Sequence, residues 1–183
     1  MQSFKIDRTI YKGRPKSEGR LDKEMRVYNL LEKLNIAYER IDHDPTMSVD
    51  SCEEVEEILD IKICKNLFLC NSQKTKFYML MMIGDKKFKS GQVSKQVGSS
   101  RLSFASPEYM EKFLDITPGS VSVLGLMNDI HNNVQLIVDK DVLAGDYIGC
   151  HPCINTSSLK ISTRDIFEKF IPYVKHEVIY IEI

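Results

Sequence analysis

The sequence predicts an α+β fold in which helices pack outside a curled, barrel-like mixed β-sheet. Short apolar runs bounded by turn residues outnumber the helical patterns, and tight turns are mixed with longer crossover connections. The run from Phe77 to Ile83 is apolar throughout, which is typical of a strand buried on both faces. At 183 residues the chain suits one main domain, which we place at residues 21–183. Residues 1–20 are polar and rich in turn formers, and are interpreted as an N-terminal extension.

The first half of the main domain alternates helical and strand patterns. Apolar residues recur at helical spacing from Met25 to Leu34. The polar turn 71–74 separates two apolar runs, as in a hairpin. The expected elements are a helix over 22–34, a strand over 37–41, a helix that begins at a capping box of Ser51 and Glu54 and ends near Leu59, and strands over 66–70 and 76–83.

The second half contains stronger local signals for the starts of helices and for turns. Ser106 and Pro107 predict a helix start, with Ser as the cap and Pro at the first helical position. The expected elements are a helix from Ser90 through Val97, a helix from Pro107 that ends before Thr117, a short strand after Ser120, strands over 134–138 and 159–162, a helix from Thr163 through Phe170, and a strand over 177–183 that forms an added edge.

Composition narrows the class of protein. The formal net charge of −1 argues against non-specific coating of DNA or RNA, so any RNA contact should use one local positive face. The sequence has no run of 18 apolar residues and no signal-peptide pattern, so no membrane partner is expected. Five scattered cysteines suit reduced thiols, which predicts a cytoplasmic protein.

Two turns could bind an oxyanion or a phosphate. Lys65 directly precedes a buried strand, where its ammonium group could reach a phosphate or hydroxyl, although a surface lysine is the simpler interpretation. Gly119 and Ser120 offer backbone N–H groups that could bind an oxyanion. An ordinary Pro-Gly turn explains the same pattern.

The loop Gly149-Cys150-His151-Pro152-Cys153 is the third candidate site. Gly before His151 and Pro after it predict a constrained bend that presents the imidazole. Cys150 and Cys153 match a Cys-x-x-Cys redox or metal motif, but no helix follows and no second Cys pair is present. A Cys nucleophile with a His base also stays open. The other three histidines, His43, His131 and His176, are interpreted as surface residues.

Five segments occur in the order found in one known family. They are Lys65-Asn66-Leu67-Phe68-Leu69, Gly84-Asp85-Lys86, Leu102-Ser103-Phe104-Ala105-Ser106, Thr117-Pro118-Gly119-Ser120-Val121-Ser122 and Gly149-x-His151-Pro152-x-x-Asn155-Thr156. Together they resemble the YbaK-like prolyl-tRNA editing family, over roughly residues 21–170. The chain is most similar to the freestanding alanyl-tRNA(Pro) deacylases of the PrdX type.

The resemblance implies a fold, a reaction and partners. It implies the editing-domain fold and hydrolysis of the ester between a wrong amino acid and the terminal adenosine of tRNA(Pro), with alanine as the expected amino acid. A synthetase pocket built for proline cannot reject a smaller side chain strongly, so a second site removes the error. It implies no cofactor, no metal and no covalent nucleophile. The expected partners are the acceptor end of tRNA(Pro) and prolyl-tRNA synthetase.

The resemblance also implies residue roles. Lys65, Gly119, Ser120 and His151 match the catalytic positions, with Lys65 near a phosphate, the glycine loop polarising the ester and His151 positioning the substrate. The matching substrate-binding positions are Thr46, Met47, Val49, Asn66, Val121, Ser122, Asn155 and Thr156. One departure is Val123, which stands where the family often has proline.

Two alternatives stay open. The same fold could remove cysteine from tRNA(Pro), or the chain could be a non-catalytic regulator that binds tRNA or the synthetase. A basic run could form the positive face for the acceptor stem or simply a solvated helix surface. Its members are Lys86, Lys87, Lys89, Lys95 and Arg101.

Overall fold

The computed structural model describes residues 5–45 and 49–183, with only the backbone for 49–52. The helices are α1 (Asp22–Lys33), α2 (Val49–Leu59), α3 (Ser90–Gln96), α4 (Pro107–Leu114), α5 (Thr163–Asp165) and α6 (Ile171–Val174); η1 (Val123–Asn128) and η2 (Lys140–Ala144) are 3-10 helices and η3 (Ile166–Phe170) is a π-helix. The strands are β1 (Ile6–Lys12), β2 (Tyr38–His43), β3 (Cys64–Cys70), β4 (Phe77–Ile83), β5 (Ser103–Phe104), β6 (Val134–Asp139), β7 (Tyr147–Cys150), β8 (Ser157–Ser162) and β9 (Val178–Ile181).

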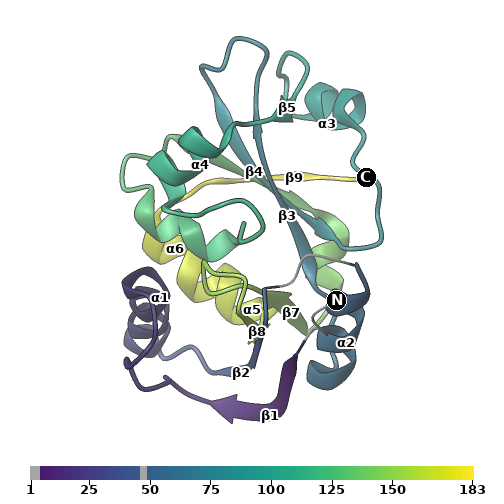
Figure 1. The fold of residues 1–183 in the computed structure, drawn as a ribbon. Coiled ribbons are helices and arrows are strands. Elements are labelled where there is room, and N and C mark those ends of the chain that lie inside the picture. The colour runs from purple at the N-terminus through teal and green to yellow at the C-terminus, as the bar shows by residue number, and fades with distance from the viewer. Residues whose placement is uncertain (1–4, 46–48) are drawn as a thin grey trace.

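The strands form two sheets, as Figure 1 shows. The first is antiparallel with the order β1-β2-β8-β7, and the second is mixed with the order β5-β3-β4-β6-β9. The α+β prediction is confirmed, but the barrel-like sheet is not, because the described strands close no barrel. The sheets approach at an isolated bridge between Ile63 and Gly149. Glycine eases this approach, since a Cβ would lie 2.5 Å from Cδ1 of Ile61 and 3.2 Å from the backbone Cα of Ile63.

Strand β4 separates two apolar layers. Met79 and Met81 face the larger core, which α4, η1 and η3 help to build, whereas Leu80 and Met82 face a smaller core beside α3. All four side chains are fully buried. The expected strand with two buried faces is therefore confirmed, and so is its hairpin with β3.

Local signals predicted some element boundaries and missed others. Helix α4 has Ser106 as its N-cap and Pro107 in its first turn, as expected. Helix α2 begins at Val49, so the start predicted from the Ser51 capping box is wrong. The strand expected after Ser120 is a 3-10 helix, because the Ser122 side chain accepts a hydrogen bond from the Leu124 N–H and caps it. Helix α5 begins at Thr163, as expected, and Ser162 caps it.

Both chain ends add edge strands. Strand β1 lies in the segment interpreted as an extension; it pairs antiparallel with β2 and is largely exposed. Strand β9 lies beside β6 at the edge of the second sheet. Strand β9 was expected as an added edge, whereas strands β1, β5 and β7 were not expected. None of the helices in the described part of the chain has the length and apolar character needed to cross a bilayer.

Two of the three histidines interpreted as surface residues are buried. His43 is 7% exposed and its Nε2 lies 2.9 Å from Oγ of Ser158. His176 is 6% exposed and pairs with Asp129 at 3.2 Å. The surface interpretation is wrong for both, because each finds a polar partner far away in sequence. His131 is exposed, as expected.

Candidate functional site

A cavity of about 440 Å³ lies between β3, the β5–α4 segment, the 118–121 turn and the 150–151 loop. We call it the His151 cavity. Its walls are mainly apolar. The lining residues that matter below are Asn66, Leu67, Phe104, Met110, Gly119, Val121, Cys150, His151 and Ser158. The structure thus brings together four predicted site residues, Asn66, Gly119, Val121 and His151, from distant parts of the sequence.

His151 is held in one orientation. Its Nδ1 lies 2.9 Å from the carbonyl oxygen of Ser157. A carbonyl only accepts, so Nδ1 carries the proton and donates. Nε2 of the neutral ring is then an acceptor, and no described residue donates to it. Burial lowers the pKa of His151, and the nearby His43 ring, 6.2 Å away between centroids, acts in the same direction. The imidazole is therefore neutral near pH 7.

A partly buried charge network fixes the backbone that orients His151. The Ser157 hydroxyl donates to Oδ1 of Asp42 at 2.6 Å. Arg20 binds both oxygens of the same carboxylate, at 3.1 and 2.6 Å, and Arg40 also contacts it. Burial alone would raise the pKa of Asp42, but these hydrogen bonds outweigh it and hold the pKa well below its usual range. Asp42 stays ionised, so the network keeps Ser157 in place.

The glycine turn offers different N–H donors from those expected. Gly119 adopts a φ of +88°, and a Cβ there would lie 3.3 Å from Nδ2 of Asn155. The Ser120 N–H already donates to the Thr117 carbonyl at 3.1 Å. Ser120 is also buried outside the cavity lining. Among the described residues, no acceptor binds the N–H of Gly119 or Val121, so these two remain for a ligand.

Asn66 presents an unused acceptor. Its Nδ2 donates to the Cys64 carbonyl at 3.1 Å, which fixes the amide orientation. In the described part of the chain, its Oδ1 is buried without a partner. Buried polar atoms are normally paired in native proteins, so an orphan acceptor at a cavity is a site where a ligand donor can bind.

Lys65 does not line the His151 cavity. Adjacent strand residues point to opposite faces, so Lys65 and Asn66 diverge. Lys65 lines a larger, open groove of about 1430 Å³, which we call the α2 groove. Its Nζ donates to the Lys86 carbonyl at 3.0 Å. Ile63 and Cys64 line both sites, so they adjoin.

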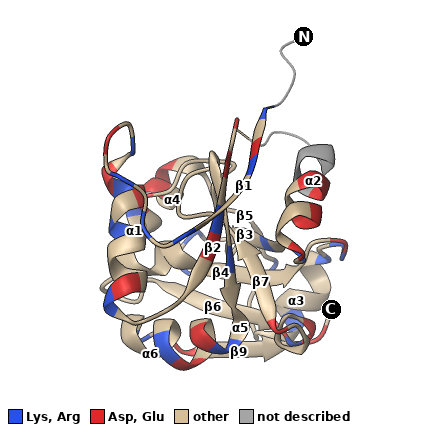
Figure 2. Cartoon of the chain, turned by 90° about the horizontal axis from the view of Figure 1, so that it is seen from below, with Lys and Arg blue, Asp and Glu red and all other residues tan. Residues whose placement is uncertain are grey.

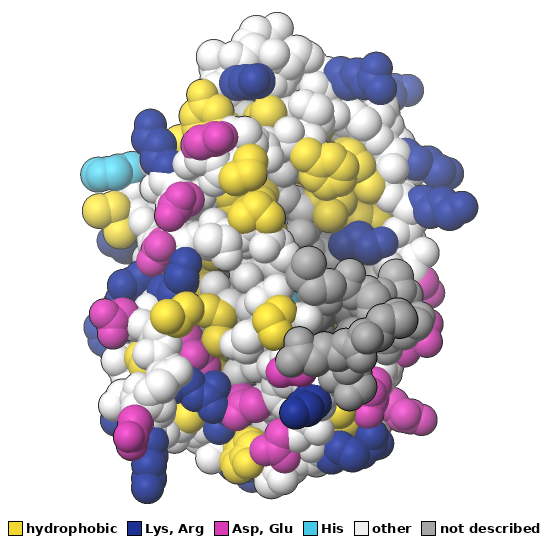
Figure 3. Space-filling view, viewed as in Figure 1, with side chains coloured by type: hydrophobic (Ala, Val, Ile, Leu, Met, Phe, Trp, Pro, Cys, Tyr) yellow, Lys and Arg dark blue, Asp and Glu magenta, His cyan; other side chains and the backbone are white. Residues whose placement is uncertain are grey.

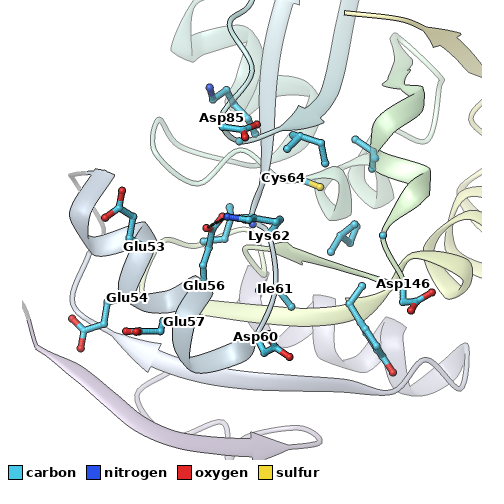
Figure 4. A pocket seen from close by; sticks show the side chains of 18 of the residues that line it. Glu53, Glu54, Glu56, Glu57, Asp60, Ile61, Lys62, Cys64, Asp85 and Asp146 are labelled. Carbon is cyan, nitrogen blue, oxygen red and sulfur yellow. Dashed lines mark hydrogen bonds and ion pairs between the residues drawn. The ribbon is translucent and has the colours of Figure 1, made fainter.

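The α2 groove is rich in acid. Figure 4 shows Glu53, Glu54, Glu56 and Glu57 on α2, with Asp60 at the end of the helix. Two basic residues of the groove are already paired with these acids, Arg8 with Glu54 and Lys62 with Glu56. Lys65 forms no ion pair with a described carboxylate, so its charge remains available.

The cysteines near His151 are buried thiols. Burial raises the pKa of Cys64 and of Cys153 to about 12, and raises that of Cys150 further. A thiol with so high a pKa is not a thiolate near neutral pH, which disfavours nucleophilic or redox use. All described cysteines are free, and within the described residues no group of three His, Cys, Asp or Glu side chains is arranged to hold a metal.

The remaining predicted residues are distributed unevenly. Thr46 and Met47 lie outside the described residues, as does the side chain of Val49. Asn155 borders Gly119, and the Thr156 carbonyl accepts the His43 N–H at 3.0 Å. Ser122 is fully buried and caps η1.

Sequence reasoning assigned no role to several cavity residues, among them Leu67, Phe104, Met110 and Ser158. Leu67 and Phe104 stand inside the segments that carried the family resemblance, which was a usable signal. Met110 and Ser158 carry no comparable signal, because their place at the cavity depends on packing between distant elements.

Comparison with known proteins identifies the family. The family model of the aminoacyl-tRNA editing domain matches residues 43–169, well over half of the chain. The chain is also 32% identical over 152 residues to the prolyl-tRNA editing protein ProX of Acetoanaerobium sticklandii, covering 82% of this chain and 92% of that protein. The chain belongs to the aminoacyl-tRNA editing domain family.

A further relative is similar in sequence, and two solved structures are similar in fold. A prolyl-tRNA synthetase associated domain-containing protein 1 of Danio rerio is 25% identical over 158 residues, with 85% of each chain covered. The fold matches a crystal structure of a candidate trans-editing enzyme for prolyl-tRNA synthetase, with a TM-score of 0.65 and 14% identity, over 89% of this chain and 98% of that one. The hypothetical protein APE2540 matches with the same TM-score and 16% identity, over 84% and 96%.

Proposed function

We propose that this editing-family chain hydrolyses mischarged Ala-tRNA(Pro) in trans, cleaving the ester between alanine and the terminal adenosine. The observation that carries the proposal is the His151 cavity itself. It places a neutral imidazole, an unpaired amide oxygen and a glycine turn with free N–H groups around one apolar space. The prolyl-tRNA editing described for the ProX relative supports the tRNA assignment.

The chemistry needs a positioned water and a polarised ester. In the proposed reaction, water attacks the carbonyl carbon of the ester. The N–H groups of Gly119 and Val121 stabilise the developing oxyanion, and Nε2 of His151 accepts a hydrogen bond from the water or the substrate and fixes its position. The bond from the carbonyl carbon to the ribose oxygen then breaks. The ribose oxygen takes up the proton that the attacking water loses. The products are alanine and uncharged tRNA.

The amino-acid end suits the apolar part of the cavity. Met110 and Val121 supply apolar surface for a small side chain. The Asn66 oxygen can accept a hydrogen bond from the substrate's ammonium group. Alanine and cysteine side chains differ by about one heavy atom. Apolar contacts discriminate only weakly between two substrates that differ so little.

Lys65 is proposed to bind a phosphate at the terminal adenosine from the adjoining α2 groove. Its ammonium group has no carboxylate partner among the described residues, and the groove meets the His151 cavity at Ile63 and Cys64. Such a contact raises affinity for every charged tRNA without favouring one amino acid. We further propose that the reaction occurs in the cytoplasm beside prolyl-tRNA synthetase.

The test is a deacylation panel with purified protein and tRNA(Pro) charged with alanine, cysteine, serine or proline. The expected result is hydrolysis of the alanyl ester, unchanged by EDTA, with prolyl ester left intact. Cysteine release with alanine untouched would move the assignment to a Cys-tRNA(Pro) deacylase. Tight binding of tRNA with no hydrolysis of any ester would reject the enzyme proposal in favour of a binding module, and loss of activity in EDTA would reject metal independence.

A further inference from the structure

Phe104 is an exposed aromatic ring at the rim of the His151 cavity. It lies on β5, a two-residue edge strand that pairs with β3, and it is 66% exposed while also lining the cavity. Its ring lies 5.8 Å from that of Phe88, tilted by 60°. Phe88 packs against the smaller core and so anchors the pair. Figure 3 shows hydrophobic side chains gathered on this face of the molecule.

Basic residues flank this ring. Lys87 and Lys89 stand on either side of Phe88, and Arg101 precedes β5; all three are exposed. The two segments are joined by hydrogen bonds, from the Ser90 hydroxyl to the Leu102 carbonyl and from the Leu102 N–H to the Ser94 hydroxyl at 2.9 Å. No described carboxylate forms an ion pair with Lys87, Lys89 or Arg101. We call Phe88, Phe104, Lys87, Lys89 and Arg101 the β5 patch.

Lys86, by contrast, does not contribute to this surface. It pairs with Asp139 at 2.6 Å and with Asp141 at 2.7 Å. The five-residue basic run expected from the sequence therefore loses one member to internal ion pairs. The exposed cations Lys87, Lys89 and Arg101 remain, close in the sequence to the two aromatic residues. Cations together with an exposed aromatic ring are the combination that binds single-stranded nucleic acid. Bases stack on the ring while phosphates contact the cations.

We propose that the β5 patch binds the unpaired 3′ end of the tRNA, with Phe104 stacking on a base next to the charged adenosine. The inference rests on the proposed function for the direction of the RNA, since the ester must enter the adjoining cavity. The distribution of charge favours RNA that approaches over the β5 patch rather than over α2. Helix α2, which lines the adjoining groove, carries Glu53 and Glu57 without a described ion-pair partner, and its acidic residues are seen in red in Figure 2. These carboxylates repel phosphates, whereas Lys87, Lys89 and Arg101 on the β5 side form no ion pair with a described carboxylate.

The chain contains no tryptophan, so Phe104→Trp introduces a single indole as a fluorescent reporter. The probe is uncharged RNA, either a minihelix ending in the single-stranded CCA of tRNA or the same minihelix without CCA. Stacking should quench the indole emission of the Phe104→Trp variant with the first RNA and leave it unchanged with the second. Equal emission with both RNAs would overturn the inference, and would be expected if the patch docks a protein instead.

Binding and kinetics of further variants separate stacking from mere hydrophobicity. Phe104→Leu should weaken CCA binding by roughly tenfold, in the range known for loss of one base–aromatic stack, while Phe104→Tyr retains affinity. In deacylation, Phe104→Leu should raise KM by a similar factor with little change in kcat. The matched control is Ile130→Ala, another highly exposed apolar residue, at 79%, which does not line the cavity. Equal affinities for the Leu and Tyr variants would contradict stacking.

These RNAs carry no ester, so the two proposals fail separately. Quenching without hydrolysis of any substrate would reject the deacylase and keep the RNA-binding surface. Hydrolysis with no quenching would reject the RNA-binding surface and keep the deacylase.

Discussion

The His151 cavity and the α2 groove share Ile63 and Cys64 but differ in chemical character. The cavity has mainly apolar walls and a few hydrogen-bonding groups held in fixed orientations. The groove is open and lined by five carboxylates of and beside α2, with Lys65 as a cation that pairs with no described acid. This difference indicates that the cavity suits chemistry on a small group, whereas the groove can only tolerate an anion close to Lys65.

Loss of the imidazole should have the largest effect. His151→Ala is expected to reduce kcat of Ala-tRNA(Pro) deacylation by about 10²–10⁴-fold, the range for removal of a positioned acid–base or orienting group. Cys150→Ser, at a neighbouring cavity residue, is the control and should be mild, because the buried thiol is not ionised. Single-turnover kinetics measures both, and a severe Cys150→Ser variant beside a mild His151→Ala variant would assign the chemistry to sulfur.

The same imidazole predicts a pH profile. Burial lowers the pKa of His151, so the neutral acceptor form persists to lower pH than in a free histidine. Activity should stay level as the pH falls to about 6.5 and decline only below it. The unfolded state binds the second imidazole proton more readily than the folded state does. Protonation of His151 should therefore lower the free energy of unfolding as the pH drops below about 6.5. An activity profile that rises on acidification would contradict a neutral His151.

The glycine turn tests the backbone donors. Gly119→Ala places a side chain at φ +88° and 3.3 Å from Asn155, and should lower activity by about 10²-fold. Gly98→Ala is the matched control, since Gly98 also has positive φ, at +64°, but faces open space. Both should lose about 1–2 kcal/mol of unfolding free energy from the left-handed backbone. Equal activity of the two variants would remove the turn from the site.

One feature of the site and one of the fold were predictable from sequence, and two features of the site were not. The bend at His151 and the doubly buried β4 follow from local residue types. The resemblance matched both Lys65 and Asn66 to site positions but did not say which cavity each lines, and strand alternation sends the two neighbouring side chains to opposite faces. The choice of Ser120 as an N–H donor failed because turn closure to Thr117 uses that donor, and this depends on backbone conformation.

Long-range partners explain most other errors. His176 could not be placed from sequence because its partner, Asp129, is 47 residues away. For His43, the Ser158 partner is 115 residues away. The close approach of the two sheets at Gly149 and Ile63 likewise joins segments far apart in the sequence, and no local pattern encodes it.

A smaller effect is expected in the α2 groove. Lys65→Ala should raise KM by about fivefold to tenfold for every aminoacyl-tRNA, since one phosphate no longer has a cation beside it, and Lys65→Arg should restore part of the affinity. Lys62→Ala is the control, because Lys62 is already paired with Glu56. A kcat effect confined to alanine would instead place Lys65 at the reacting ester.

The smallest effects should come from removing charges in the β5 patch and on α2. Lys87→Gln with Lys89→Gln should weaken RNA binding and reduce the salt dependence of log Kd by about 0.7 for each phosphate that the variant no longer neutralises. Glu53→Gln with Glu57→Gln should leave affinity equal or slightly tighter. Binding titrations between roughly 50 and 200 mM salt measure both. A larger loss from the glutamate pair would reverse the proposed direction of RNA approach.

The most direct test is the position of a non-hydrolysable substrate, 3′-deoxy-3′-(alanylamino)adenosine, bound to the protein. In a crystal structure or by intermolecular NOEs, its alanyl methyl group should contact Met110 and Val121, with the amide carbonyl at the Gly119 turn. An alanyl group seated among the carboxylates of α2 instead would contradict the assignment of the His151 cavity as the reaction site.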